Sequence, residues 1–214
     1  MQRQPLILEN LTIAREGVVL CEGLSLRAEP GDIWLVEGAN GSGKSTLLRA
    51  MAGLHHVEDG RILLCDIPLS MHDSYPKMIA WLGHKRALKL HMTVEANVAH
   101  WARMQGVPEN IEAALEYFDL GPYRSMPCGQ LSAGWKERVA LTRLLTTQAT
   151  LWLLDEPMAH LDEQGAALVQ SIILTRAEQG GIIFMSNHAR IESNKVKRIN
   201  LSEHAGSTPV NEAA

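Results

Sequence analysis

The sequence has no long apolar run, which limits how the chain can act at a membrane. Hydrophobic residues make up 46% of its 214 residues, yet no stretch approaches the ~20 apolar residues that a membrane-spanning helix needs. Residues 1–5 also lack the apolar core of a secretory signal. We therefore expect a soluble globular chain. If it acts at a membrane, another subunit would supply the spanning helices.

An excess of positive charge and paired cysteines are also missing. Lys and Arg number 20 against 24 Asp and Glu, a formal net charge of −4. There is no basic footprint of the kind that binds DNA or RNA, so no nucleic-acid partner is expected. The three cysteines, Cys21, Cys65 and Cys128, are far apart and form no C-x-x-C pair. Reduced thiols in a cytosol are the simplest interpretation.

The most informative segment that is present is a glycine-rich loop at residues 38–46. It reads G-x-x-x-x-G-K-S-T, after an apolar strand-like run and before a helix-like run, the order that phosphate binding requires. Glycines let backbone N–H groups turn toward phosphate oxygens, and the helix points its positive N-terminal end at the same anion. The loop predicts a nucleoside triphosphate site with magnesium. Its candidate binding residues are Gly38, Ala39, Asn40, Gly41, Ser42, Gly43, Lys44, Ser45 and Thr46.

Two side chains of this loop have specific predicted roles. Lys44 would reach the β- and γ-phosphates, and the Ser45 hydroxyl would bind Mg²⁺. The alternative is a chance match, expected in about 1% of chains of this length. The flanking strand and helix argue against it.

A second motif combines an apolar strand with two acids. Residues 151–154 are apolar and lead directly into Asp155, Glu156 and Pro157. A buried strand delivers its last residues at the carboxyl edge of a sheet, where ligands of open α/β sheets bind. Asp155 is predicted to serve the magnesium shell, directly or through water. Glu156, expected to point the other way along the strand, would be the general base for a water in line with the γ-phosphate. The competing interpretation is a solvated acidic turn.

The rest of the pattern predicts an α/β chain with two additions. Alternating residues around Glu16 and Gly17 favour an antiparallel hairpin with one wet face. From Thr93, which has an N-cap side chain, the pattern becomes helical, and residues from about 85 to 130 are expected to form a helical insertion. Residues 205–214 are expected to be a mobile tail. The expected elements are strands at 6–14, 18–28, 33–36, 61–65, 79–82, 151–154 and 182–185, and helices at 46–54, 93–105, 109–118 and 136–147.

A third motif narrows the field of triphosphatases. Residues 131–135 read Leu-Ser-Ala-Gly-Trp before an amphipathic helix, and they resemble the LSGGQ signature of ABC ATPases. Ser132 and Gly134 match that signature, whereas Ala133 and Trp135 depart from it. The tryptophan either alters packing at the nucleotide interface or is a core residue at the start of the helix.

Other landmarks of the same family follow in order. Residues 159–162 look like the D-loop, and His188 takes the switch-histidine position after a strand, where it would donate to the γ-phosphate. The resemblance runs from about residue 6 to residue 191. It implies an α/β fold with a P-loop ABC ATPase core, an antiparallel β lobe and a helical subdomain insertion, all in one domain over residues 1–204.

The resemblance also implies partners and a mechanism. In ABC ATPases the signature serine of one subunit contacts the γ-phosphate held by the phosphate loop of another, so Ser132 and Gly134 would bind the ATP of a second copy or a homologue. The implied unit is a head-to-tail pair with two ATP, attached to integral membrane subunits through a groove near residues 83–90. It would be peripheral, on the cytoplasmic face of the inner (plasma) membrane. Further similarity, at residues 83–85, 88–93, 131–134 and 180–181, is to the haem-exporter ATP-binding subunits of cytochrome c maturation, which implies release of a haem chaperone.

Two positions depart from the family pattern. His84 stands where most relatives carry the Q-loop glutamine, at the magnesium. A neutral imidazole could hydrogen-bond a water there, or His84 is only a polar loop residue. Arg15 stands where many relatives place an aromatic side chain that stacks on adenine. A guanidinium plane can also stack on a base, or Arg15 is a surface charge of the hairpin.

Other functions fit part of the sequence. The chain could be the ATPase subunit of an ABC transporter for another substrate. A soluble ABC-type regulatory ATPase that acts on ribosomes or DNA would usually have two cassettes and a basic surface, unlike this chain. A small-molecule P-loop kinase would leave residues 131–135 and 159–162 unexplained. A catalytically weak nucleotide switch also stays open, because the signature and Q-loop positions are altered.

Overall fold

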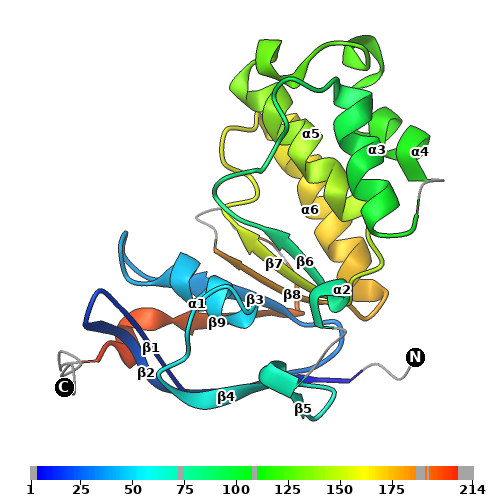
Figure 1. Ribbon diagram of the computed structural model, residues 1–214. Helices are drawn as coiled ribbons and strands as arrows, with labels where there is room; N and C mark the ends of the chain where they lie inside the picture. The colour runs from blue at the N-terminus through cyan, green and yellow to red at the C-terminus, as the bar shows by residue number, and fades with distance from the viewer. Residues whose placement is uncertain (1–3, 72–74, 108–109, 187–190, 192, 207–214) are drawn as a thin grey trace.

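A computed structural model describes residues 4–71, 75–107, 110–186, 191 and 193–206 of the chain. Its strands form two sheets, and Figure 1 shows the larger sheet between the smaller one and a group of helices. In sheet order, the smaller sheet contains β2 (Val18–Ala28), β1 (Leu6–Arg15), β4 (Asp59–Leu64) and β5 (Ile67–Pro68). The larger contains β6 (Ile79–Leu82), β7 (Leu151–Asp155), β8 (Ile182–Ser186), β3 (Ile33–Glu37) and β9 (Val196–Asn200).

The smaller sheet begins with the predicted hairpin. Strands β1 and β2 are antiparallel, with Arg15 paired to Val18 at the turn. Glu16 and Gly17 make that turn with φ of 53° and 76°. A positive φ costs glycine little, so the Glu-Gly pair explains where the chain reverses.

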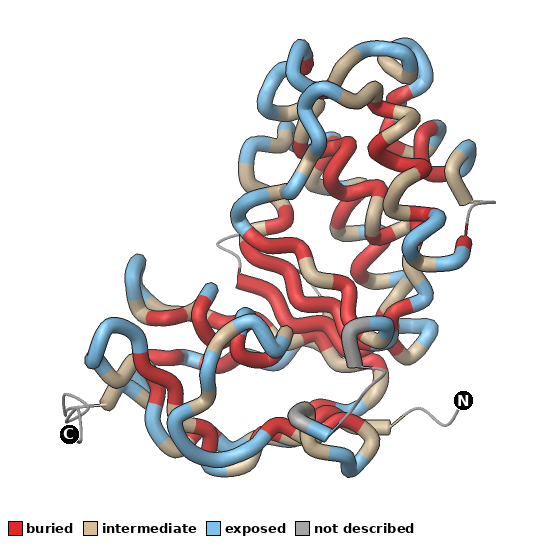
Figure 2. Tube along the Cα trace, in the orientation of Figure 1, coloured by how far each residue is buried: buried red, intermediate tan, exposed pale blue. Residues whose placement is uncertain are grey.

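The larger sheet is parallel, and its central strands β7 and β8 are buried on both faces. In β7, Trp152 and Leu154 pack against the helices, whereas Leu151 and Leu153 pack against α1 and the smaller sheet. Figure 2 shows the central strands as buried along their length. A strand covered on both faces needs apolar residues throughout, which is why β7 and β8 read as unbroken apolar runs.

Helices cover both faces of the larger sheet. Helix α1 lies toward the smaller sheet, while α3, α4, α5 and α6 lie together beyond the opposite face (Figure 1). The helices are α1 (Lys44–Met51), α2 (Tyr75–Met78), α3 (Val94–Met104), α4 (Ile111–Tyr117), α5 (Ala133–Leu145) and α6 (Glu163–Glu178). Short 3-10 turns are η1 (Leu69–Met71), η3 (Gly121–Tyr123), η4 (Cys128–Gln130) and η5 (Leu201–His204).

The observed architecture confirms the predicted fold class: an α/β core with an antiparallel β lobe and helices inserted between β6 and β7. The sequence analysis assigned no structure to α6 or β9. In β9 only Ile199 is buried, so the strand lacks the apolar run that marks its neighbours. Within the described ranges, no helix combines the length and apolarity needed to cross a bilayer.

Candidate functional site

The glycine-rich loop joins β3 to α1, as predicted. Gly43 is the N-cap residue of α1, with φ of 98°. A Cβ at Gly43 would lie 2.9 Å from the Cβ of Leu20, so both the backbone conformation and the close approach of β2 require glycine. At Gly38, where φ is 147°, a Cβ would lie 2.5 Å from Oγ of Ser42. These two glycines let the loop fold back on itself at the start of the helix.

Lys44 places its ammonium group over this loop. Its Nζ donates to the carbonyl oxygens of Gly38 at 2.8 Å and Ala39 at 2.9 Å. The first N–H groups of a helix have no acceptor within the helix. Together with the helix dipole and the ammonium group, the N–H groups of α1 make the loop attractive to an anion.

Asp155 is the last residue of β7 and is 4% exposed. It lies opposite Ser186, the last residue of β8. The Ser186 hydroxyl donates to Oδ1 of Asp155 at 2.7 Å, which fixes the orientation of the carboxylate. Ser186 was not predicted as a site residue, although its position at the end of the second apolar strand was a usable signal.

Glu156 leaves the strand in a left-handed backbone conformation, with φ of 49°. The expectation that it continues the alternation of the strand is wrong, because β7 ends at Asp155. The Glu156 N–H lies within hydrogen-bond distance of the carbonyl oxygen and the hydroxyl of Ser186, at 3.1 and 3.0 Å. Its carbonyl oxygen accepts from Nη2 of Arg86 at 2.7 Å. A positive φ at a non-glycine residue persists only where its surroundings hold it, and these contacts do so.

One cavity brings the phosphate loop and Glu156 together. Its volume is about 590 Å³. Arg15, at the end of β1, lines the same cavity and forms an exposed ion pair with Glu16 at 3.2 Å. The cavity lining thus combines cationic and helix-start residues with two acidic residues, Glu16 and Glu156. The loop and α1 contribute Asn40, Gly41, Gly43, Lys44, Ser45 and Thr46 to its lining.

Ser132 and Gly134 line a separate hollow, of about 220 Å³. Ser132 is the N-cap of α5, and residues 160–162 form the other side of the hollow. There Asp162 caps α6 by accepting from the Gly165 N–H at 2.8 Å, and this amide holds the pKa of Asp162 below its usual range. The two motifs therefore lie next to each other, and the residues of their hollow are all different from those that line the phosphate-loop cavity.

Trp135 contributes to that hollow and also to the packing of the helical lobe. Its ring lies 4.4 Å from the ring of Tyr123, centroid to centroid, and the Arg138 guanidinium lies 4.9 Å from its centroid. The packing agrees with a core role at the start of α5, and an effect of Trp135 on the nucleotide interface stays a prediction.

The two candidate histidines have different outcomes. His84 is exposed and lies two residues after Leu82, at the end of β6. Leu82 pairs with Leu154 of β7. His84 is therefore at the same sheet edge as Glu156, but it is not one of the residues that line the cavity. His188 lies outside the described residues.

Comparison with known proteins decides the family. The family model described as ABC transporter matches residues 21–159. A Wolbachia pipientis wMel protein named cytochrome c biogenesis ATP-binding export protein CcmA is 41% identical over 187 residues, which cover 86% of this chain and 89% of that protein. This chain belongs to the ABC transporter family.

Two solved structures agree with the ABC ATPase fold. One is a putative ABC transporter ATP-binding protein from Pyrococcus furiosus, with a TM-score of 0.82 and 24% identity, covering 94% of this chain and 100% of that one. Another is a dimeric ATP-binding cassette in a post-hydrolysis state with ADP and Pi, with a TM-score of 0.75 and 21% identity, covering 86% and 88%.

The chain is therefore an ABC transporter ATPase subunit, which binds nucleotide and hydrolyses ATP to drive transport. The predicted family, nucleotide ligand and enzyme class are confirmed at this level. The roles of individual residues, the divalent cation and the assembly remain predictions.

The ABC ATPase also contains a buried ion pair that the sequence analysis missed. Arg86 and Glu137 lie 2.7 Å apart, with side chains 12% and 4% exposed. Burial raises the pKa of Glu137, and Arg86 opposes that shift. The two residues are 51 positions apart in the chain. No local pattern marks such a pair, although a charged residue inside the apolar face of a helix, as Glu137 is in α5, is a signal worth following.

Proposed function

We propose that this chain is the ATP-hydrolysing subunit of a cytochrome c maturation haem exporter, in which hydrolysis powers release of a haem chaperone complex. It would be attached to integral membrane subunits at the cytoplasmic face of the inner membrane. The supporting observation is the pairing of the phosphate loop and Glu156 in one cavity, in a chain with 41% identity to a cytochrome c biogenesis export ATPase over most of its length.

ATP would lie with its phosphates against residues 38–46 and its base near Arg15. Lys44 and the α1 N–H groups would neutralise the phosphates. Arg15 has an exposed side chain at the cavity rim, so its planar guanidinium can stack on adenine.

The oxygen donors near the loop fit Mg²⁺, a hard cation that prefers carboxylate and hydroxyl oxygens. Ser45 and Asp155 would hold it, and it would supply charge neutralisation at the phosphates. The hydroxyl of Ser186 holds the Asp155 carboxylate in place at 2.7 Å. His84, exposed at the same sheet edge, would contribute at most a water-mediated contact.

Glu156 would act as the general base. Glu156 lines the cavity that the phosphate loop also lines, where a water would approach the γ-phosphate in line with the leaving group. A positioned general base contributes about 10²- to 10⁴-fold in rate. His188 would donate to the γ-phosphate from the neighbouring strand end.

A second subunit would complete each site. Ser132 and Gly134 line a hollow whose residues are all different from those of the phosphate-loop cavity. One chain thus carries both halves of a site on different surfaces, and a head-to-tail pair brings them together around two ATP. To move such a pair from 1:99 to 99:1 closed takes about 5.5 kcal/mol of differential binding, which several charge-assisted hydrogen bonds to phosphate can supply.

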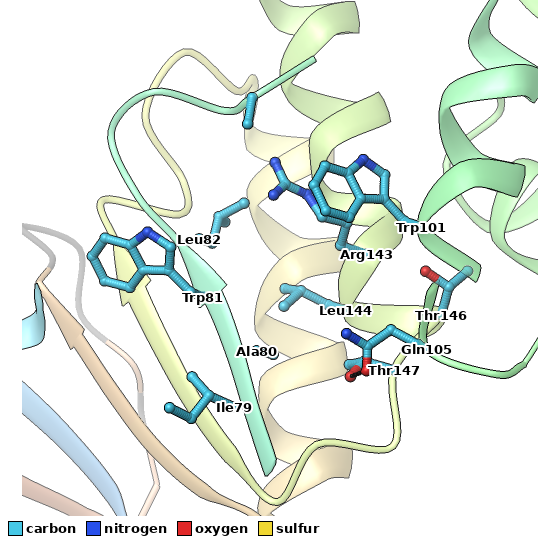
Figure 3. A pocket seen from close by; sticks show the side chains of 11 residues that line it. Ile79, Ala80, Trp81, Leu82, Trp101, Gln105, Arg143, Leu144, Thr146 and Thr147 are labelled. Atoms are coloured by element: carbon cyan, nitrogen blue, oxygen red, sulfur yellow. Dashed lines mark hydrogen bonds between the residues drawn. The ribbon is translucent and has the colours of Figure 1, made fainter. Parts of the chain in front are cut away.

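A groove between β6 and the helical lobe would receive the membrane subunits. Its volume is about 270 Å³. Figure 3 shows Trp81 on the sheet side and Trp101 on the helix side, with Arg143 beside Trp101. Ala87 also lines it, which places the groove next to residues 83–90, where the sequence predicted that a helix of the membrane subunits docks. Ala87 also belongs to the helical insertion proposed at about residues 85–130, so this insertion forms part of the groove.

A deletion strain of the source organism tests this function. Complementation with the wild-type chain should restore covalent haem in c-type cytochromes, measured by haem-dependent peroxidase staining, and Lys44→Ala should not. Wild-type cytochromes in the deletion strain would contradict the proposal. If the chain is instead the ATPase subunit of a transporter for another substrate, the deletion strain should make wild-type cytochromes. Other membrane subunits should then stimulate ATP hydrolysis by the chain.

A further inference from the structure

Arg86 connects the end of β7, just before the candidate general base Glu156, to the helix that begins at the signature. Its Nη1 donates to the carbonyl oxygens of Gly83 at 2.7 Å and Asp155 at 3.0 Å. Its Nη2 donates to the carbonyl oxygen of Glu156 at 2.7 Å. On the other side, Nε donates to Oε2 of Glu137 at 2.8 Å, and Glu137 belongs to α5.

The contacts with the carbonyl oxygens of Asp155 and Glu156 hold the peptide groups on both sides of Glu156. Glu156 has a positive φ, so its backbone conformation depends on its partners. Ser186 holds its N–H, and Arg86 holds its carbonyl oxygen. The backbone conformation from which the Glu156 side chain leaves is therefore set partly by where the guanidinium lies.

The same residue is also linked to the groove at β6. Arg143 on α5 donates to the carbonyl oxygen of Arg86, and its guanidinium lies 4.3 Å from the Trp101 ring centroid. Arg143 and Trp101 both line the groove (Figure 3). Burial lowers the pKa of Arg143 to about 10, and the positive charge of Arg86 adds to this shift. The charges of Arg86, Arg143 and Glu137 therefore influence one another.

We propose that Arg86 is a positioning residue for Glu156, through which a displacement of α5 or of the groove reaches the catalytic carboxylate. A guanidinium group suits this role because it has five donors in a fixed plane. Here they reach three backbone carbonyl oxygens and one carboxylate. A movement of α5 relative to β7 would stretch or break either the hydrogen bond to Glu137 or those to the carbonyl oxygens of Asp155 and Glu156. The inference rests on the proposed role of Glu156 as general base.

The direct test replaces Arg86 by lysine in the chain assembled with its membrane subunits. Lysine keeps the charge beside Glu137, but a single ammonium group cannot span the carbonyl oxygens of residues 83, 155 and 156. We expect kcat for ATP to fall about tenfold or more, since small misplacements of catalytic groups have effects of this size. The Kd of a fluorescent ATP analogue should stay within about twofold of wild type, because among the described residues the hydrogen-bond partners of Arg86 (residues 83, 137, 143, 155 and 156) all lie outside the phosphate loop and α1.

A matched control and a second variant separate positioning from folding. The control is Arg124→Lys, at a second arginine that forms ion pairs. Arg124 lies 2.6 Å from Glu95 and 2.8 Å from Glu112, and kcat should not change in this variant. The double variant R86Q/E137Q replaces the buried ion pair by a neutral pair, a change that buried ion pairs often tolerate. It should melt near the wild-type temperature and still have the low kcat.

Two results would overturn the inference: a wild-type kcat in Arg86→Lys, or recovery of kcat in the double variant, since both would make the carbonyl contacts irrelevant. Failure of the proposed function gives a different result, namely normal turnover in Glu156→Gln. If Glu156→Gln is inactive while the Arg86 variants turn over normally, only the role of Arg86 is wrong.

Discussion

At the scale of single residues, the site depends on backbone positions that side chains elsewhere hold. The Glu156 peptide is fixed by Ser186 and Arg86, and Asp155 by Ser186. The sequence identified Asp155 and Glu156 because they directly follow an apolar strand. It could not identify Arg86, because the partners Glu137, Asp155 and Glu156 lie 51 to 70 positions away and only the folded chain brings them together.

Replacing Glu156 by glutamine tests the general base. The amide keeps the shape and the backbone contacts of the carboxylate but cannot accept a proton, so turnover should fall about 10²- to 10⁴-fold while ATP binding is kept. Phosphate release and calorimetric ATP binding measure the two properties. The variant should also accumulate as a closed pair with ATP in gel filtration. Normal turnover would remove Glu156 from the mechanism.

Replacing His84 by glutamine tests whether the imidazole has a role in ATP hydrolysis. Glutamine is the residue that the family resemblance implies at this position. Because His84 is exposed and does not line the cavity, His84→Gln should preserve or raise ATP hydrolysis. Steady-state phosphate release at saturating ATP and Mg²⁺ checks this, with Lys44→Ala as the inactive control. A complete loss of activity would show that the imidazole has a specific role of its own.

At the scale of elements, predictions held where local signals were strong. The Thr93 hydroxyl accepts from the Ala96 N–H at 3.1 Å and begins α3, as its N-cap chemistry predicted. Strand β6 has the predicted bounds, and β7 and β8 each extend one residue further than predicted. The sequence prediction did not include helix α6, which directly follows the D-loop-like residues 159–162. Its Asp162 cap is an N-terminal signal of the same kind as Thr93.

Asn97 on α3 ties this helix to the loop before it. It is 1% exposed, and its side chain contacts the Lys89 N–H at 2.9 Å and the carbonyl oxygens of Lys89 and Thr93 at 3.1 and 3.0 Å. Asn97→Ala should lower the free energy of unfolding by about 1–3 kcal/mol, because it leaves buried polar groups without partners. Urea denaturation measures this.

Met104→Ala is the control for that experiment. Met104 is on the same helix and is 64% exposed, so its truncation should change the unfolding free energy by no more than about 0.5 kcal/mol. Equal losses in the two variants would show that the Asn97 hydrogen bonds do not stabilise the loop.

At the scale of the whole molecule, one chain presents two candidate sites on different surfaces. The cavity at the phosphate loop carries Lys44 and Glu156, and the hollow at the signature carries Ser132 and Gly134. The sequence contained both motifs, but their separation on the surface is a property of the fold. It follows from the position of α5 in the helical lobe, away from the carboxyl end of β3.

The most direct measurement is a structure of the Glu156→Gln chain, closed with ATP and Mg²⁺. The account predicts that Ser132 of the partner subunit lies within hydrogen-bond distance, about 3 Å, of the γ-phosphate held by Lys44. A closed assembly in which Ser132 is far from every bound nucleotide would contradict it.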